Sequence, residues 1–292
     1  MNPVIVVAYN ATEEAADGLA LGQLLAELQG AELVVAPVFP HTPSSEVSDR
    51  ETQRQFRRAL AETHAEAARL LGNDAFELWP VFGEQVPAGI QALATDHGAD
   101  MIVFGSPEHG PIGRVLLGSS AEEVVHGAPC AVAVAPHGLH KHPHIAPNVV
   151  GVAFDGSPES VAALDRGLVL ARSAGAALRV IAVEPSVWSR PMHGNGSIAE
   201  EFARHCDKLE GDVGVERRFL HGDPATELAR ESHQLGLLVC GSRGVGPLRR
   251  VMLGSVSAAV MRSASCPLIV VPRGTPGVAA SAPARAASQT GS

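Results

Sequence analysis

Three glycines and a serine in the C-terminal half of the chain have a spacing that suits the binding of an anion. Gly241 and Gly244 are separated by two residues, and Gly254-Ser255 follows after nine more. Glycine lets the backbone adopt positive φ and approach a ligand closely. A helix that opens at Ser255 would offer free N–H groups, and Arg243 adds a cation. The pattern predicts a phosphate-binding loop, although a tight turn followed by a helix cap would use the same residues.

Two further polar segments are expected near this loop. Asp155 follows a continuous apolar run, and His221-Gly222-Asp223 follows another. If both runs are parallel strands, their carboxyl ends meet at one edge of a sheet, where such folds bind ligands. The loop has no Gly-Lys-Ser or Gly-Lys-Thr sequence and its glycines follow a fourth strand, so it is neither a Walker A loop nor a dinucleotide fingerprint.

The chain contains an internal repeat. Residues 105–136 and 241–272 align without a gap, with fourteen of 32 positions identical, and residues 4–14 parallel residues 149–159. Self-similarity of this kind indicates a duplicated unit. We therefore expect a first domain at 1–136 (copy one), a His-rich linker at 137–148, a second domain at 149–272 (copy two) and a flexible tail at 273–292.

Each copy is predicted to alternate strands and helices. In copy two, short apolar runs predict strands at 149–154, 178–183, 215–220, 237–241 and 267–271. Ser157 and Asp223 are positioned to cap the helices that follow two of them. Copy one repeats this order with a longer second helix near 50–71. The alternation predicts two tandem doubly wound, Rossmann-like α/β domains, each with a five-stranded parallel sheet.

The spacing Gly-x2-Gly-x9-Gly-Ser after a buried strand, together with VAFDGSP at the first strand and CPLIVVP at the last, resembles the universal stress protein family in its ATP-binding subset. The resemblance covers the chain to about residue 272, as in a tandem member. It implies an adenine nucleotide at the sheet edge, with Ala153 and Val183 beside the adenine and Asp155 facing the nucleoside. It also implies contacts of the loop with ribose and phosphates, and Mg²⁺ bound with the triphosphate.

The expected nucleotide site of copy two therefore consists of a set of small and polar residues: Ala153, Asp155, Gly156, Val183, Gly222, Gly241, Ser242, Arg243, Gly244, Gly246, Pro247, Gly254, Ser255, Val256 and Ser257. His221 and Glu184 are secondary candidates, for a ligand contact and for a metal-bound water. A corresponding first site would use Ala8, Asn10, Gly105, Gly118, Ser119 and Ser120.

Copy one departs from the pattern at three positions. Asn10 replaces the aspartate, Pro107 the arginine and Glu108 the second glycine of the loop. The Glu108 side chain would block close approach of the backbone, and its charge would repel phosphate. We expect about one tightly bound ATP per chain, with the first site left for a smaller anion or AMP.

Composition narrows the function classes. Hydrophobic residues make up 46% of the chain, and the formal charge of −9 argues against nucleic acid as the main partner. The apolar runs are too short to span a membrane, and no secretory signal is recognisable. Four cysteines without a CxxC pair, of which Cys130 and Cys266 read as core residues, favour a reducing, cytoplasmic setting.

The sequence shows no positioned base, nucleophile or acidic metal pair. We therefore expect an ATP-binding regulatory or signalling module of the stress response, with at most slow hydrolysis; a slow ATP hydrolase and a scaffold with vestigial sites are the alternatives. The four linker histidines could bind a metal, but a solvated, flexible connector is favoured. The fifth strands, 131–135 and 268–271, are expected at sheet edges, where they would pair between copies and in a homodimer.

Overall fold

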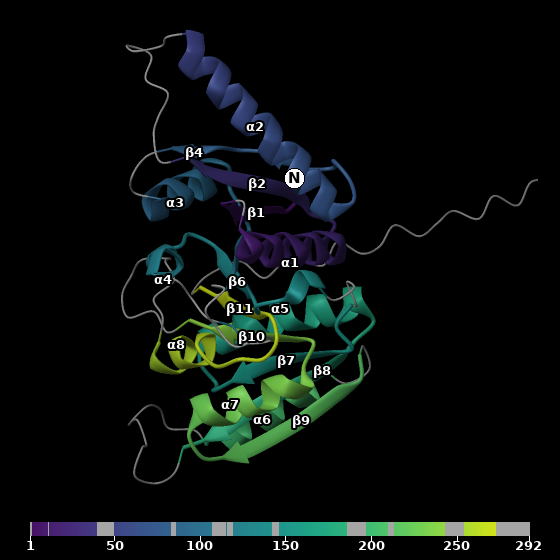
Figure 1. The fold of residues 1–292 in the computed structure, drawn as a ribbon. Coiled ribbons are helices and arrows are strands. Elements are labelled where there is room, and N and C mark those ends of the chain that lie inside the picture. Colours follow the sequence, from purple (N-terminus) through teal and green to yellow (C-terminus); the bar gives the residue numbers. More distant parts are fainter. Residues whose placement is uncertain are drawn as a thin grey trace, which may run out of the picture.

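A computed structural model of the protein describes residues 2–10, 12–39, 50–82, 86–106, 115, 119–141, 146–185, 197–209, 213–242 and 254–272. Its strands form one continuous sheet that runs through both copies, in the order β3-β2-β1-β5-β6-β11-β10-β7-β8-β9, with β4 paired to β2 (Figure 1). Neighbouring strands within each copy are parallel. The predicted α/β class with a parallel sheet in each copy is confirmed.

The elements follow the predicted alternation. Copy one contains β1 (Val4–Tyr9), α1 (Glu13–Gln29), β2 (Glu32–Phe39), α2 (Arg50–Leu71), β3 (Glu77–Leu78), β4 (Val81–Phe82), α3 (Val86–Asp96), β5 (Met101–Gly105), α4 (Ser119–Val125) and β6 (Ala131–Ala135). Copy two contains β7 (Val149–Phe154), α5 (Pro158–Ala174), β8 (Ala177–Glu184), α6 (Ile198–Asp207), β9 (Val215–His221), α7 (Pro224–Glu231), β10 (Leu237–Gly241), α8 (Ser255–Met261) and β11 (Leu268–Val271). The third strand of copy one is split into β3 and β4, because Pro80 between them cannot donate to the ladder.

The two copies are joined by an antiparallel pair of strands, β6 and β11. Leu268 lies opposite Val134, and Ile269 lies opposite Ala133. Every residue of both strands is buried. The predicted pairing between copies is therefore present, and it removes β6 and β11 from the edges of the sheet. The edges are formed by β3 and β4 at one end and by β9 at the other.

Each face of the sheet carries one layer of helices that continues across both copies (Figure 1). Side chains from α1, α2, α5 and α6 form the buried cluster on one face. Side chains from α3, α4, α7 and α8 form the cluster on the other. Arg166 on α5 reaches copy one, where its Nη1 donates to Oε1 of Gln29 over 2.8 Å. Burial lowers the pKa of this guanidinium from its usual value.

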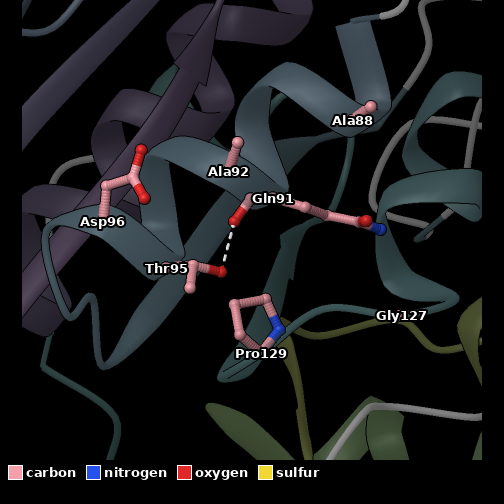
Figure 2. Close-up of a pocket in the computed structure, with 7 residues that line it drawn as sticks. All are labelled: Ala88, Gln91, Ala92, Thr95, Asp96, Gly127 and Pro129. Atoms are coloured by element: carbon pink, nitrogen blue, oxygen red, sulfur yellow. Dashed lines mark hydrogen bonds between the residues drawn. The ribbon is translucent and has the colours of Figure 1, made fainter.

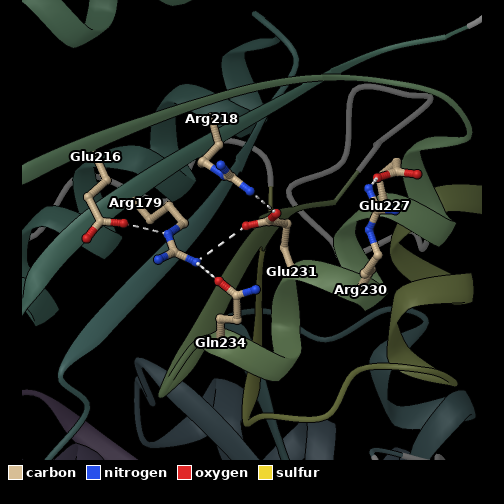
Figure 3. A network of polar contacts seen from close by, with 7 residues as sticks. All are labelled: Arg179, Glu216, Arg218, Glu227, Arg230, Glu231 and Gln234. Carbon is tan, nitrogen blue, oxygen red and sulfur yellow. Dashed lines mark hydrogen bonds and ion pairs between the residues drawn. The ribbon is translucent and has the colours of Figure 1, made fainter.

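The edge strand β9 is lined with charge (Figure 3). Glu231 of α7 is buried and lies 2.9 Å from Arg218 of β9 and 3.4 Å from Arg179 of β8. Arg179 also pairs with Glu216 of β9 over 2.7 Å. Charged side chains on an edge strand discourage pairing with another strand.

The first residues of the linker are held against α1. Asp17 is fully buried, and its carboxylate accepts hydrogen bonds from the backbone N–H groups of Gly138 (2.7 Å) and His140 (2.8 Å). The ring Nδ1 of His140 lies 2.6 Å from the same carboxylate, and His137 is buried. The expectation of a solvated connector is therefore wrong for residues 137–140, which are buried or half-buried, because the buried Asp17 carboxylate requires the donors of Gly138 and His140. His142 and His144 lie outside the described residues.

The four cysteines are buried and unbonded to one another. Burial raises the pKa of the Cys130 and Cys240 thiols to about 12, which leaves them protonated. The interpretation of Cys130 and Cys266 as core residues is confirmed. Across the described ranges, no helix combines the length and apolar character needed to cross a membrane.

We predict that alanine at Gly22 or Gly167 destabilises the protein. These glycines occupy the same position of α1 and α5, and an added Cβ would lie 2.3 Å from a γ-carbon of Val7 or Val152. Valine is stiff at χ1, so the clash should outweigh the gain in helix propensity and lower the free energy of unfolding by about 1–3 kcal/mol in urea titrations. The exposed control Ser173→Ala should change it by less than about 0.5 kcal/mol. Equal stability of all three variants would contradict this packing.

Candidate functional site

The carboxyl edge of copy two brings the predicted polar segments together. Asp155 follows β7, Glu184 and His221 end β8 and β9, and Ser242 follows β10. Asp155 is exposed, and its Oδ1 accepts hydrogen bonds from the backbone N–H (3.1 Å) and the hydroxyl (2.5 Å) of Ser157. Ser157 in turn caps α5, accepting from the N–H of Ser160 over 3.2 Å. The first strand thus ends in a turn that fixes both the helix and the carboxylate.

Gly241 is required by close packing at the end of β10. A Cβ at this position would lie 2.6 Å from the carbonyl carbon of Glu159 in the first turn of α5. The hydroxyl of Ser257, in α8, donates to the carbonyl oxygen of Gly241 over 2.9 Å. The two ends of the predicted loop, 241–242 and 254–257, are therefore held together, as the spacing of the motif requires. Gly254 precedes α8 as its N-cap and has no side chain to cap it.

Ser242 has a buried hydroxyl that bonds nothing in the described structure. Its side chain is fully buried, and its Oγ has no hydrogen-bond partner, while its backbone N–H donates to Val271. The corresponding Ser106 of copy one donates its hydroxyl to the carbonyl oxygen of Ala135 over 2.6 Å. The sequence placed Ser242 in the loop, but no sequence signal distinguishes an unpaired hydroxyl from a paired one.

The base end of the predicted site lies on β7, β8 and β9. Ala153 is half-buried on β7, and Val183 is buried near the end of β8. Nδ1 of His221 lies 3.5 Å from Oε2 of Glu184, which ends the neighbouring strand. Gly222 has φ of 145° and donates its N–H to the carbonyl of Glu184, so this turn needs glycine. His221 and Gly222 thus contact the end of the second strand of copy two, at the carboxyl edge of the sheet.

Part of the predicted site is not described. Arg243, Gly244, Gly246 and Pro247 of copy two, and Gly118 of copy one, lie outside the described residues. The same holds for Pro107 and Glu108. Their contacts with phosphate remain predictions.

Copy one keeps the turn after its first strand. The amide oxygen of Asn10 accepts from the Thr12 hydroxyl over 2.8 Å, and Thr12 caps α1 through the N–H of Ala15. Asn10 thus performs the same local role as Asp155 without the charge. Ala8 is half-buried like Ala153, and Ser119 and Ser120 open α4.

A separate hollow of about 420 Å³ lies against α3 (Figure 2). It is lined by Ala88, Gln91, Ala92, Thr95, Asp96, Gly127 and Pro129. The Gln91 side chain already donates to the carbonyl oxygen of Val124 over 2.9 Å, at the end of α4. None of the predicted nucleotide residues lines this hollow. The Gln91 amide that borders it is already used to satisfy carbonyl oxygens at the C-terminal end of α4.

A family model described as "Universal stress protein family" matches residues 1–136 and 148–272 of the chain. A universal stress protein of Mycolicibacterium smegmatis is 34% identical over 183 residues, covering 59% of this chain and 62% of that protein. One from Mycobacterium tuberculosis is 26% identical over 290 residues, covering 92% and 99%. The crystal structure of a universal stress protein from Archaeoglobus fulgidus has a TM-score of 0.71 and 21% identity, covering 94% and 100%.

We predict that the cap of α7, beside His221, contributes to stability in a pH-dependent way. The hydroxyl and backbone N–H of Thr226 donate to Asp223 and hold the pKa of its carboxyl below the usual range. A lowered pKa stabilises the fold above about pH 4, and this contribution is lost as the pH falls through the folded-state value. Asp223→Ala should therefore lower the free energy of unfolding by about 1 kcal/mol at pH 7, with a smaller difference near pH 3.

The control is Asp223→Asn, which keeps an acceptor for the Thr226 N–H without the charge. This variant should retain most of the free energy of unfolding at pH 7, and that free energy should fall less than in the wild type as the pH is lowered. The measurement is urea unfolding between pH 3 and pH 7. If Asp223→Ala had the same free energy of unfolding as the wild type at every pH, the capping role would be contradicted.

Proposed function

Because the chain belongs to the universal stress protein family, we propose that copy two binds ATP or a related adenine nucleotide as a regulatory module of the cytoplasmic stress response. The observation that carries the proposal is the buried, unpaired hydroxyl of Ser242 within a loop whose ends are tied by Ser257 and Gly241. A buried hydroxyl without a partner is costly, and an oxygen of a bound ribose or phosphate would satisfy it.

We propose that Mg²⁺ binds together with this nucleotide. In the described ranges, no group of three or more His, Cys, Asp or Glu side chains could hold a metal by itself. Mg²⁺ bound with nucleotides takes only one or two carboxylates and completes its shell with water and phosphate oxygens. Asp155 and Glu184, at the ends of neighbouring strands, are the carboxylates we propose for this role, and Mg²⁺ would offset their repulsion of the triphosphate.

A binding role suits this edge better than rapid turnover. Oδ1 of Asp155 accepts both hydrogen bonds from Ser157 at the start of α5, so we do not propose it as a general base for hydrolysis. The nucleotide would instead bias a conformation or a contact with a partner, at most with slow hydrolysis. Release of phosphate, measured alongside binding, separates this role from that of a slow ATP hydrolase.

A homodimer remains part of the proposal, with a restriction from the fold. Because β6 and β11 pair with each other, edge-to-edge association between chains must use β3 or β4 at one end of the sheet, or β9 at the other. The two-residue length of β3 and the paired charges of β9 both limit such pairing. Light scattering at micromolar concentration decides the oligomeric state.

We predict one tightly bound ATP per chain. Gly244→Glu places in copy two the residue that copy one carries at Glu108, and should weaken ATP binding by roughly tenfold in titration calorimetry with Mg²⁺. Ala203→Glu, at an exposed position of α6, controls for the added charge and should leave the affinity unchanged. An unaltered affinity in Gly244→Glu would overturn the assignment of the loop. Conversely, Asn10→Asp, Pro107→Arg and Glu108→Gly combined should raise the stoichiometry toward two.

Ser242→Ala offers a second prediction, with Ser106→Ala as its matched control. Removing an unpaired hydroxyl should leave the ligand-free protein at least as stable, yet weaken ATP binding by about tenfold, the scale of one hydrogen bond. Ser106→Ala removes a hydrogen bond to Ala135 and should lower stability by about 1 kcal/mol without changing ATP affinity in copy two. Identical ATP affinity in Ser242→Ala and the wild type would contradict a ligand role for this hydroxyl.

A further inference from the structure

One face of helix α2 is left uncovered by the rest of the described chain. Ala67 and Leu71, in the last turns of the helix, are buried against the core, and Phe56 packs on rings from β2 and β4. The opposite face is exposed along the helix, which lies at the outer end of copy one (Figure 1). The corresponding helix of copy two, α6, has 10 residues against 22 in α2, so this surface belongs to copy one alone.

The exposed face carries three acidic residues and three arginines, paired along the helix. Arg54 lies 3.9 Å from Glu51, Arg58 lies 2.8 Å from Glu62, and Arg69 lies 3.9 Å from Glu66. At about 3.6 residues per turn, all six fall within about one third of the helix circumference, whereas Arg50 and Arg57 lie outside this arc. Exposed ion pairs add little to stability, so the fold does not require them. Their consequence is a locally neutral face on a chain with a formal charge of −9.

The order of the six charges along α2 is self-complementary. From Glu51 to Arg69 the signs run negative, positive, positive, negative, negative, positive. The same order results when the helix is read backwards with every sign inverted. Two α2 helices placed antiparallel and centred at Leu60 therefore bring each charge to the level of an opposite charge: Glu51 to Arg69 of the second chain, Arg54 to Glu66, and Arg58 to Glu62. A parallel pair would place every charge beside its own equivalent, which is repulsive.

The uncharged residues of the same face suit this arrangement. Ala61 and Ala65 are exposed, and their short side chains leave room for a neighbouring helix to approach. In the antiparallel pair they lie near the levels of Arg58 and Arg54 of the second chain. The CH₂ groups of an arginine can cover apolar surface while its guanidinium stays in water.

We propose that α2 is the docking surface for a second copy of this chain, in an antiparallel α2–α2 contact with two-fold symmetry. Two chains of net charge −9 repel each other over most of their surface, so a neutral and self-complementary face favours approach in this orientation. A two-fold contact uses the face once in each chain and closes at the dimer. The proposal names the surface of the homodimer considered above and leaves the edges of the sheet unpaired.

The test uses two full-length variants with opposite changes of charge. Arg54→Glu combined with Arg58→Glu leaves only acidic residues from 51 to 66 on this face, and Glu62→Arg combined with Glu66→Arg leaves only arginines from 54 to 69. Each variant places like charges at the same level in its own dimer, so its dissociation constant should rise by roughly tenfold or more in sedimentation velocity. An equimolar mixture of the two should form a heterodimer, because each face then meets its opposite.

The matched control is Arg204→Glu combined with Arg217→Glu, which reverses two exposed arginines of copy two and should leave the dimer unchanged. Because the contact joins exposed charges, raising NaCl from about 0.05 M to about 0.5 M should weaken the wild-type dimer. Circular dichroism reports whether each variant is folded. If a reversed variant does not fold, Arg58→Gln combined with Glu62→Gln keeps the side-chain lengths and should weaken the dimer several-fold; no weakening overturns the proposal.

A wild-type chain that stays monomeric overturns the proposal, as does a mixture of folded variants that forms no heterodimer. A dimer that persists unchanged in both reversed variants also overturns it and points to another surface, such as an edge of the sheet. Failure of nucleotide binding is read separately by calorimetry, because the α2 variants should bind ATP as the wild type does.

Discussion

The backbone pairing of β6 with β11 is the interaction on which the rest of the molecule depends. A parallel sheet that ended at either strand would leave a row of unpaired N–H and C=O groups and an apolar edge. Pairing the two edges within one chain removes both liabilities and makes one sheet of two domains. Because these strands are built of small and branched apolar residues, the joint is fully buried and forms the centre of the molecule.

The joint also decides which other contacts the copies make. It places α5 against copy one, so that Arg166 can reach Gln29 from a buried position. It brings the N–H of Val115, which follows β5, to the carbonyl oxygen of Ala264, just before β11, over 2.8 Å. Val115 of copy one therefore contacts copy two. The copies share both hydrophobic clusters and are expected to unfold together rather than as independent domains.

Duplication has kept the backbone and changed the side chains. Asn10 and Asp155 make the same turn, and Thr12 and Ser157 make the same helix cap, so the first loop is equivalent in both copies. The hydroxyl of Ser106 has a carbonyl partner whereas that of Ser242 has none. Differences of this size leave the fold intact, because they fall at strand ends rather than within the ladders. The strand ends are therefore the positions at which the two copies can come to bind different ligands.

The sequence by itself determined the features that depend on near neighbours. The strands, the caps at Ser157 and Asp223, the burial of Cys130 and Cys266 and the duplication all follow from local patterns of apolar, glycine and capping residues. Only the tertiary structure decided that β6 meets β11 antiparallel and that Asp17 binds a linker residue 121 positions away. It also decided that Phe39 lies beside Phe82 and that the Ser242 hydroxyl is unpaired. These features depend on which segments, distant in sequence, lie next to one another in the fold. The packing of the whole chain determines those neighbours, and no local sequence signal reports them.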